Sequence, residues 1–163
     1  MALDLTVVRG EGTVETFRVE AGAVGSITPG KPVKVGGTGD NYVVLLATGD
    51  PEIGTDRMVG IARSTSTDTA AADGVVEVEM IVPNKTVIRG KATTPANIDT
   101  DAKLLALLND TVTFTLTSTT FSINEDEGTD PNVHGLTIID GNVANGTLDV
   151  QVADAAGLSG GSV

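Results

Sequence analysis

The chain has 163 residues, no cysteine, 10 basic and 22 acidic side chains, and a formal net charge of −12 at pH 7. The absence of cysteine excludes a disulfide framework, a thiolate nucleophile and a cysteine-ligated metal. Affinity for nucleic acid comes largely from cationic side chains, so this charge predicts no nucleic-acid partner. No segment approaches the roughly 20 apolar residues of a membrane-spanning helix, and we expect no membrane partner.

The N-terminal segment, residues 1–12, has two alternative interpretations. Its apolar residues alternate imperfectly with polar ones before two glycines interrupt the pattern; they are Leu3, Leu5, Val7 and Val8. The segment is either an extended arm that pairs with a partner protein or the first strand of the protein's own sheet.

Most of the remaining chain has the pattern of short β-strands separated by turn residues. Alternation of apolar and polar residues is clearest at 13–20, 74–82 and 111–117. Shorter strands are predicted at 32–35, 58–62, 86–89, 119–123, 133–140 and 147–152. The continuous apolar run 42–47 predicts a central strand that is covered on both faces.

One segment, about residues 99–109, is rich in helix-forming residues instead. Asp99 is placed to cap its N-terminus, and an apolar stripe is expected from Leu104, Leu105 and Leu108. The pattern predicts one short helix that packs on a sheet.

These patterns together predict a mostly β protein, a small β-barrel or sandwich with one short helix and an extended N-terminal arm. We expect a single β-rich domain over residues 13–153, with its one candidate subdivision near 93–110. The glycine-rich residues 154–163 are expected to form a flexible tail.

The only histidine, His134, has Ser122 and Asp130 near it in sequence. A catalytic triad requires a serine, a histidine and a carboxylate in mutual contact, and neither neighbour has the context of an activated nucleophile. A histidine at the edge of a loop is therefore the favoured interpretation.

The densest acidic cluster consists of Glu125, Asp126, Glu127 and Asp130. Such oxygen ligands suit calcium, but the EF-hand spacing is absent, so a solvated acidic loop is favoured and calcium binding stays open. The glycine-rich segment 36–39 lacks the ending of a phosphate-binding loop and is interpreted as a turn. We predict no catalytic residue, no cofactor and no metal, and therefore a protein that is not an enzyme.

Three stretches follow one another in the first part of the chain. They are residues 23–33 (AVGSITPGKPV), 59–62 (VGIA) and 70–78 (AAADGVVEV). The order of a Pro-Gly-Lys turn, a Val-Gly-Ile-Ala strand and a glycine-led strand of alternating valines resembles the capsid decoration (cement) proteins of tailed bacteriophages. The resemblance covers about residues 1–92, and the strands from Thr111 onward lie outside it.

The resemblance implies a structural virion protein, made in the host cytoplasm, that binds the outside of an assembled icosahedral head and stabilises it. Its partners would be the major capsid protein and further copies of itself, commonly in a homotrimer. Leu3, Leu5, Val7 and Val8 would then form a capsid-contact arm that pairs by strand addition. The alternative is another non-enzymatic β-sandwich module, from a phage tail or a cell-surface adhesin.

Overall fold

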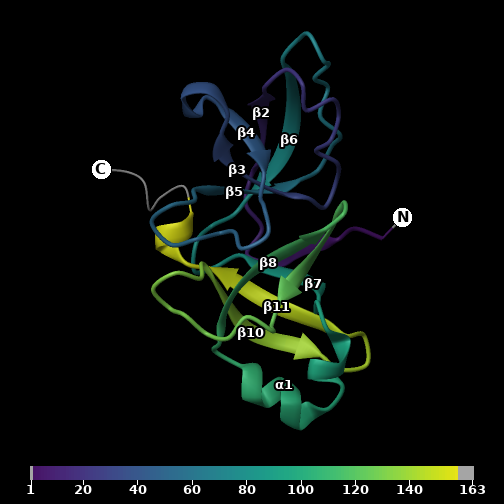
Figure 1. The fold of residues 1–163 in the computed structure, drawn as a ribbon, viewed down its shortest axis with the longest axis vertical. Coiled ribbons are helices and arrows are strands. Elements are labelled where there is room, and N and C mark those ends of the chain that lie inside the picture. Colours follow the sequence, from purple (N-terminus) through teal and green to yellow (C-terminus); the bar gives the residue numbers. More distant parts are fainter. Residues whose placement is uncertain (1, 158–163) are drawn as a thin grey trace.

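The computed structural model describes residues 2–157, which form two curled antiparallel sheets and one α-helix (Figure 1). The prediction of a mostly β protein with one short helix is confirmed. The first sheet has the strand order β2 (Val14–Val19), β6 (Gly74–Met80), β5 (Met58–Ala62), β3 (Pro32–Gly36) and β4 (Tyr42–Leu45). The second has the order β1 (Leu5–Arg9), β7 (Val87–Lys91), β11 (Thr147–Val152), β10 (Leu136–Asn142), β8 (Thr111–Thr117) and β9 (Thr120–Asn124).

The first sheet follows from the alternation of its strands. On β6, Val76 and Val78 are buried whereas Glu77 between them is exposed, because successive side chains of a strand point to opposite faces. The buried face belongs to a small apolar cluster that comprises Val19, Ile27, Val33, Val43, Val59, Ala62, Val76 and Val78.

The second sheet curls until its far edge approaches its beginning. At the edge strand β9, the N–H of Phe121 donates to the carboxylate of Asp4, which directly precedes β1, at 2.8 Å. The carbonyl of Ile123 accepts from the N–H of Thr93, just after β7, at 2.9 Å. These bonds occupy edge groups that would otherwise be open to pairing with another chain.

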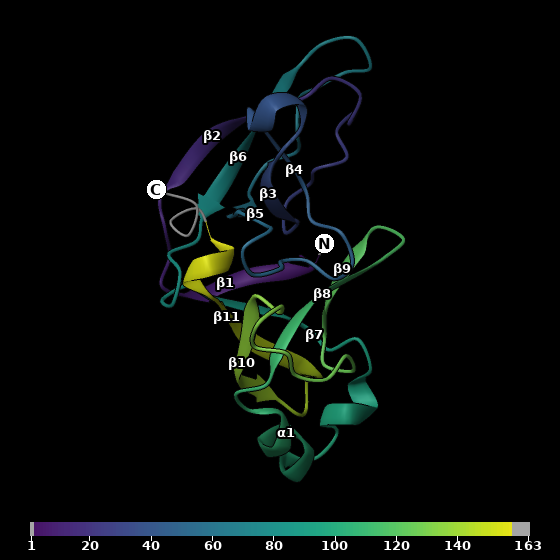
Figure 2. The ribbon, with the colours of Figure 1, turned by 60° about the vertical axis from the view of Figure 1, so that its left-hand side comes forward.

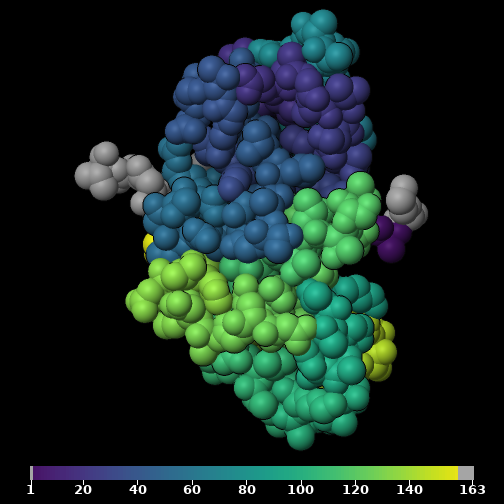
Figure 3. Space-filling view, in the orientation of Figure 1, coloured from purple at the N-terminus to yellow at the C-terminus, as the bar shows by residue number. Residues whose placement is uncertain are grey.

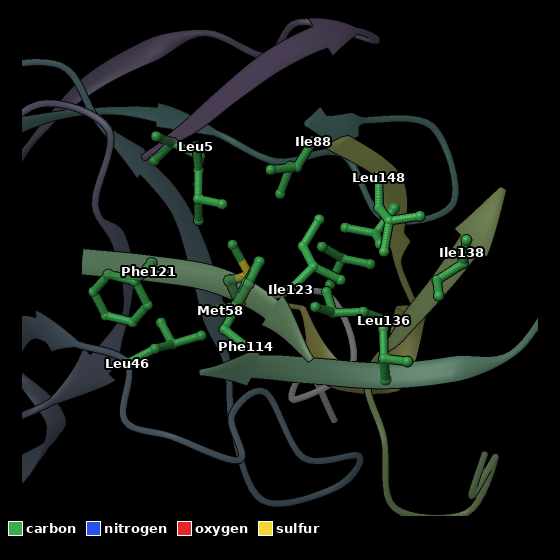
Figure 4. Packing of buried hydrophobic residues seen from close by; sticks show 14 of the residues in the cluster. Leu5, Leu46, Met58, Ile88, Phe114, Phe121, Ile123, Leu136, Ile138 and Leu148 are labelled. Atoms are coloured by element: carbon green, nitrogen blue, oxygen red, sulfur yellow. The ribbon is translucent and has the colours of Figure 1, made fainter. Parts of the chain in front are cut away.

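A large apolar cluster joins the two sheets (Figure 4). Met58 and Leu46 come from the part of the chain that builds the first sheet, and both are buried against residues of the second. Phe114 and Phe121 meet edge to face there, with their ring centroids 6.4 Å apart. The two sheets follow one another along the long axis of the molecule and share this core (Figures 1 and 2).

The chain passes between the sheets at 10–13, from β1 to β2, and again at 81–86, from β6 to β7. The chain changes sheet at these two segments, and neither of them falls within 93–110. Residues 93–110 contain a 3-10 helix (Pro95–Ile98) and the helix α1 (Asp101–Leu107), and they belong to the half of the molecule with the second sheet.

Helix α1 is shorter than the predicted segment 99–109, and it begins differently. Thr100 is its N-cap, with a hydroxyl that accepts from the N–H of Lys103 at 3.3 Å. Asp99 instead forms an ion pair with the Lys103 ammonium at 2.7 Å. The predicted cap is wrong by one residue, because Asp99 still has helical backbone angles while Thr100 is extended.

The apolar stripe of α1 also differs from the prediction. Leu104, Leu107 and Leu108 pack against the large cluster, whereas Leu105 is 66% exposed. Leu107, rather than Leu105, lies on the packed face. It follows Leu104 by three residues, and residues three or four apart share a face of a helix.

Strand β4 lies at the edge of its sheet, so the prediction of a central strand for 42–47 is wrong. The run is apolar because it serves two cores. Val43 is buried in the small cluster, Leu46 is buried in the large one, and Leu45 packs against both.

The predicted tail is wrong for its first four residues. Asp154–Ala156 form a 3-10 helix, Ala156 is fully buried in the large cluster, and Gly157 bridges to Met58. The rest of the predicted tail, residues 158–163, lies outside the described residues.

Candidate functional site

The residues of the predicted arm form the first strand of the protein's own sheet. Strand β1 pairs antiparallel with β7, with Leu5 opposite Gly90 and Val7 opposite Ile88. Leu5 is fully buried, Val7 packs against the large cluster, and Val8 is half-buried at a register shift. A bulge at this point explains why two valines are adjacent in an otherwise alternating strand.

Leu3 alone among the four arm residues is exposed, at 45%. The next residue, Asp4, fixes the beginning of β1, because its carboxylate accepts from the ammonium of Lys31 as well as from Phe121. Lys31 also donates to the carbonyl of Thr119 and lies 5.9 Å from the centre of the Phe121 ring. The N-terminal segment is therefore tied to the β8–β9 hairpin.

The side chains of His134, Ser122 and Asp130 have separate partners. The Nδ1 atom of His134 is 3.0 Å from the carbonyl of Thr111, and its Nε2 atom is 3.9 Å from Glu127. The hydroxyl of Ser122 pairs with that of Thr93. The backbone carbonyl of Asp130 accepts from the His134 N–H at 2.8 Å, while its carboxylate accepts from the backbone of the intervening loop. These partners hold the loop in place, and they are not the contacts of a triad.

The acidic segment is folded back onto the protein, so its interpretation as a solvated loop is wrong for Glu125. The carboxylate of Glu125 is buried and accepts from the backbone N–H groups of Thr93 at 2.9 Å and Thr94 at 2.7 Å. Asn97 donates to it as well, at 3.3 Å. The carboxylate thereby satisfies the donors that precede the 3-10 helix.

Its neighbours have similar roles. Glu127 accepts from the N–H of Thr113 and, at 2.9 Å, from the hydroxyl of the same residue. Asp126 accepts from the side chains of Thr94 and Asn97. Within residues 2–157, no group of three or more histidine and carboxylate side chains is arranged to hold a metal ion.

The glycine-rich segment 36–39 forms part of a tight turn. Glu20 accepts from the backbone N–H of Thr38 at 3.1 Å and from its hydroxyl. A carboxylate of the protein itself therefore occupies the donors that a phosphate would use.

A partly buried ion cluster lies at the base of the long loop 46–57 and was not found from the sequence. The ammonium of Lys34, on β3, is 2.7 Å from Asp50 and 2.6 Å from Asp56. Burial by itself lowers the pKa of Lys34, but hydrogen bonds to the two carboxylates outweigh it and raise that pKa above its ordinary value. In the sequence, the only sign of this ion cluster is a lysine between the two valines of a predicted strand.

The same cluster perturbs Asp56. Burial by itself raises the pKa of its carboxyl, but hydrogen bonds from Lys34 and from the Glu52 N–H outweigh burial and leave the pKa below its ordinary value. These ion pairs fix the loop 46–57, which reaches the half of the molecule with the second sheet. There the Asp50 carbonyl accepts from the Phe114 N–H at 2.7 Å, and the Ile53 N–H donates to the carbonyl of Val133 at 2.8 Å.

A groove runs beside β4, formed by two adjoining cavities of about 200 Å³ and 460 Å³ that share Ser26 and Leu45 as lining residues. The smaller cavity lies between β4 and the end of β2, where Val19 lines it. The larger reaches Leu116 and Phe121 of the β8–β9 hairpin. Figure 3 shows the surface of this hairpin, in green, against the blue and purple surface of the first sheet.

The edge of β4 turns backbone polar groups toward this groove. Lys34 lies opposite Val44, and the Leu46 N–H donates to the carbonyl of Pro32 on β3. Because N–H and C=O groups alternate in direction along a strand, those of Val43 and Leu45 point away from β3. Strand β2 lies on this side of β4 and contacts it.

Comparison of the chain with protein-family models, with curated proteins and with solved structures finds no match in any of the three. Among the described residues, no helix is both long enough and apolar enough to cross a bilayer.

Proposed function

We propose that the protein is a non-enzymatic structural component of a phage virion, which binds the outside of the assembled capsid and stabilises it. The observation that carries the proposal is the position of the three sequence stretches with the decoration-protein resemblance. The Gly30 N–H donates to the Ala62 carbonyl at 2.9 Å, which joins the first stretch to the second. The Gly22 N–H, beside the first stretch, donates to Thr69, beside the third, at 2.9 Å. Motifs far apart in sequence thus form one continuous part of the molecule.

The proposed partners are the major capsid protein and two further copies of this chain. Binding only to the assembled shell would stabilise that shell by mass action, by about 2.7 kcal/mol per site at a free concentration a hundredfold above Kd. A homotrimer would multiply the contacts that each bound unit makes. Repetition over many sites compensates for the scarcity of aromatic side chains, which number three Phe and one Tyr.

The test is binding of the purified protein to expanded, undecorated heads of the phage whose genome encodes it. We expect saturable co-sedimentation and a higher melting temperature of the heads. Unexpanded heads are the matched control, and we expect weaker binding to them. The sedimentation coefficient of the free protein measures the proposed trimer separately.

Absence of binding to expanded heads, with a monomer in solution, would contradict the capsid role. That outcome would favour the alternative of a β-sandwich module from a phage tail or an adhesin. Such a module would differ from an immunoglobulin-like sandwich. The two sheets of that sandwich stack face to face, whereas the sheets here share one end-to-end core.

A further inference from the structure

We propose that Asn145 is a site of spontaneous deamidation that Lys91 assists. In this reaction the peptide nitrogen of Gly146 attacks the side-chain amide of Asn145, and the Lys91 ammonium stabilises the negative charge that develops. Water is the only other reactant. The inference goes beyond the proposed capsid role and does not depend on it, because it concerns the chemistry of one turn and not a partner.

The sequence distinguishes Asn145 from the other asparagines, because it is the one that a glycine follows. Glycine has no Cβ, so no side chain hinders the approach of its nitrogen to the amide carbon of the preceding residue. Asn142 lies in the same segment but is followed by Val143, whose branched side chain is stiff and crowds that approach. Asn142 is therefore an internal control.

The structure places Asn145 in the turn between β10 and β11, where it is exposed to water. The side-chain oxygen of Asn142 accepts from the Asn145 N–H at 2.9 Å and fixes the turn before the reacting pair. The Gly146 N–H donates to the carbonyl of Val143 at 3.3 Å, longer than the roughly 2.7–3.2 Å of an ordinary N–H···O bond. The nitrogen that must lose its proton is therefore held only weakly.

Lys91 supplies the electrostatic part of the site. It lies opposite Thr147 in the ladder of β7 and β11, and its ammonium donates to the main-chain carbonyl oxygen of Asn145. That oxygen belongs to the same peptide group as the Gly146 nitrogen. Loss of the N–H proton spreads negative charge over both atoms by resonance, and a cation at the oxygen stabilises the anion.

The reaction balances without an oxidant or a reductant. The Gly146 nitrogen gives its proton to solvent and forms a bond to the Asn145 Cγ atom, and the bond from Cγ to the amide nitrogen breaks. The amide nitrogen takes up a proton and leaves as ammonia, which gives a cyclic imide. Water then opens one of the two imide bonds, so that the product is either aspartate or isoaspartate.

The product changes a defined part of the molecule. The turn borders a cleft beside the 3-10 helix, lined by Lys91 and Pro95 among others (Figure 1). The reaction adds one negative charge beside the Lys91 ammonium, and isoaspartate also adds a methylene group to the main chain. The Ala92 N–H donates to the Gly146 carbonyl at 3.0 Å, and we expect this bond at the end of β7 to weaken in the isoaspartate form.

The experiment is incubation of the folded full chain at neutral pH, followed over time by peptide mapping with a fragmentation method that separates aspartate from isoaspartate. We expect both products to accumulate at position 145, whereas Asn142 stays intact. Hydrogen exchange of the aged protein should show reduced protection of the Ala92 amide. Modification of Asn142 at the same rate as Asn145 would overturn the proposal.

Variants of Lys91 test its role directly. Lys91→Met keeps the apolar stem but removes the charge, and it should slow the reaction about tenfold, whereas Lys91→Arg should keep the rate close to that of the wild type. Lys85→Met is the matched control, since it removes the same charge at an exposed position before β7, and it should leave the rate unchanged. In urea all four chains should react at one rate, because unfolding removes the contact between Lys91 and the turn.

Circular dichroism shows whether each variant is folded, and Lys91→Gln replaces Lys91→Met if the latter is not. An unchanged rate in the folded neutral variant, or an equal decrease in Lys85→Met, would overturn the assistance by Lys91. A rate difference that persists in urea would do the same. The rates are measured on the free chain, so failure of capsid binding would leave them unaffected and the two proposals fail independently.

Discussion

Carboxylates in this chain act repeatedly as caps for the backbone of irregular segments. Asp56 accepts from the N–H of Glu52, Asp68 from the N–H of Gly25, and Glu125 from two consecutive threonines. Loops between short strands leave backbone donors without ladder partners, and a charged acceptor forms the stronger kind of hydrogen bond with them. Part of the acidity of the sequence therefore serves the fold itself.

Glu125→Ala is the sharpest test of such a cap. The substitution leaves the N–H groups of Thr93 and Thr94 without their acceptor, and buried donors cost roughly 1–3 kcal/mol each when unpaired. We expect the free energy of unfolding in urea to fall by about 3 kcal/mol. Asp126→Ala, at the exposed neighbouring carboxylate, should cost less than about 1 kcal/mol, and equal losses would argue against the cap.

The sequence shows the acidic cluster but cannot show its partners. Glu125 meets residues about 30 positions earlier in the chain, and nothing in the local pattern distinguishes it from Asp126. Only the return of β9 toward the end of β7 buries one carboxylate and leaves the other exposed. The same limit applies to Lys34, which reads as an ordinary exposed lysine of a strand.

At the scale of elements, patterns set within a few residues were predictable. The alternation of β6 and β8 and the helix-forming segment before Thr111 were recognised from local sequence. The position of β4 was not, because an apolar run appears the same in a central strand as in an edge strand that faces two cores. The groove beside β4 depends on that long-range arrangement as well.

Helix α1 gives a direct test of which leucines support it. Leu107 packs on the large cluster and Leu105 is exposed, so Leu107→Ala removes apolar contact while Leu105→Ala removes almost none. We expect a loss of about 1 kcal/mol in the free energy of unfolding for Leu107→Ala, since that side chain is only half-buried. Leu105→Ala should change it by less than about 0.5 kcal/mol, and the reverse order would contradict the observed face.

The loop 46–57 should be the acid-sensitive element. The pKa of Asp56 is lower in the folded protein than in the unfolded chain, so the unfolded chain binds more protons as the pH falls. The stability contributed by ionised Asp56 is complete above the ordinary aspartate pKa of about 4. It is lost as the pH falls through the lower pKa that Asp56 has in the folded protein. We expect the amides of this loop to lose protection from hydrogen exchange below about pH 4.

Lys34→Met is the control for that pH dependence. Methionine keeps the apolar stem of the side chain but removes the charge that lowers the pKa of Asp56. The variant should be less stable at neutral pH, and its free energy of unfolding should depend less on pH in the acid range. An acid dependence identical to that of the wild type would assign the titration to other carboxylates.

At the scale of the whole molecule, two sheets share one core, and two crossings of the chain connect them. Met58, Ile61 and Ile81 come from the half with the first sheet, yet they belong to the same cluster as Leu5 and Ile88 of the second. Separation of the two halves would expose all of these side chains to water. The sheets are therefore coupled by burial, although no strand of one forms a ladder with a strand of the other.

Met58→Ala tests this coupling, because Met58 is fully buried where the two halves meet. Truncation of a buried methionine costs roughly 2–5 kcal/mol, from lost transfer free energy and from the cavity that remains. If the molecule unfolds as one unit, hydrogen exchange followed by mass spectrometry will show the same loss of protection in peptides from β6 and from β10. Val75→Ala, on the exposed side of β6, should leave both unchanged. Loss of protection confined to one sheet would mean that the two halves unfold separately. A cavity near one sheet can destabilise the other only when both sheets open in the same cooperative transition.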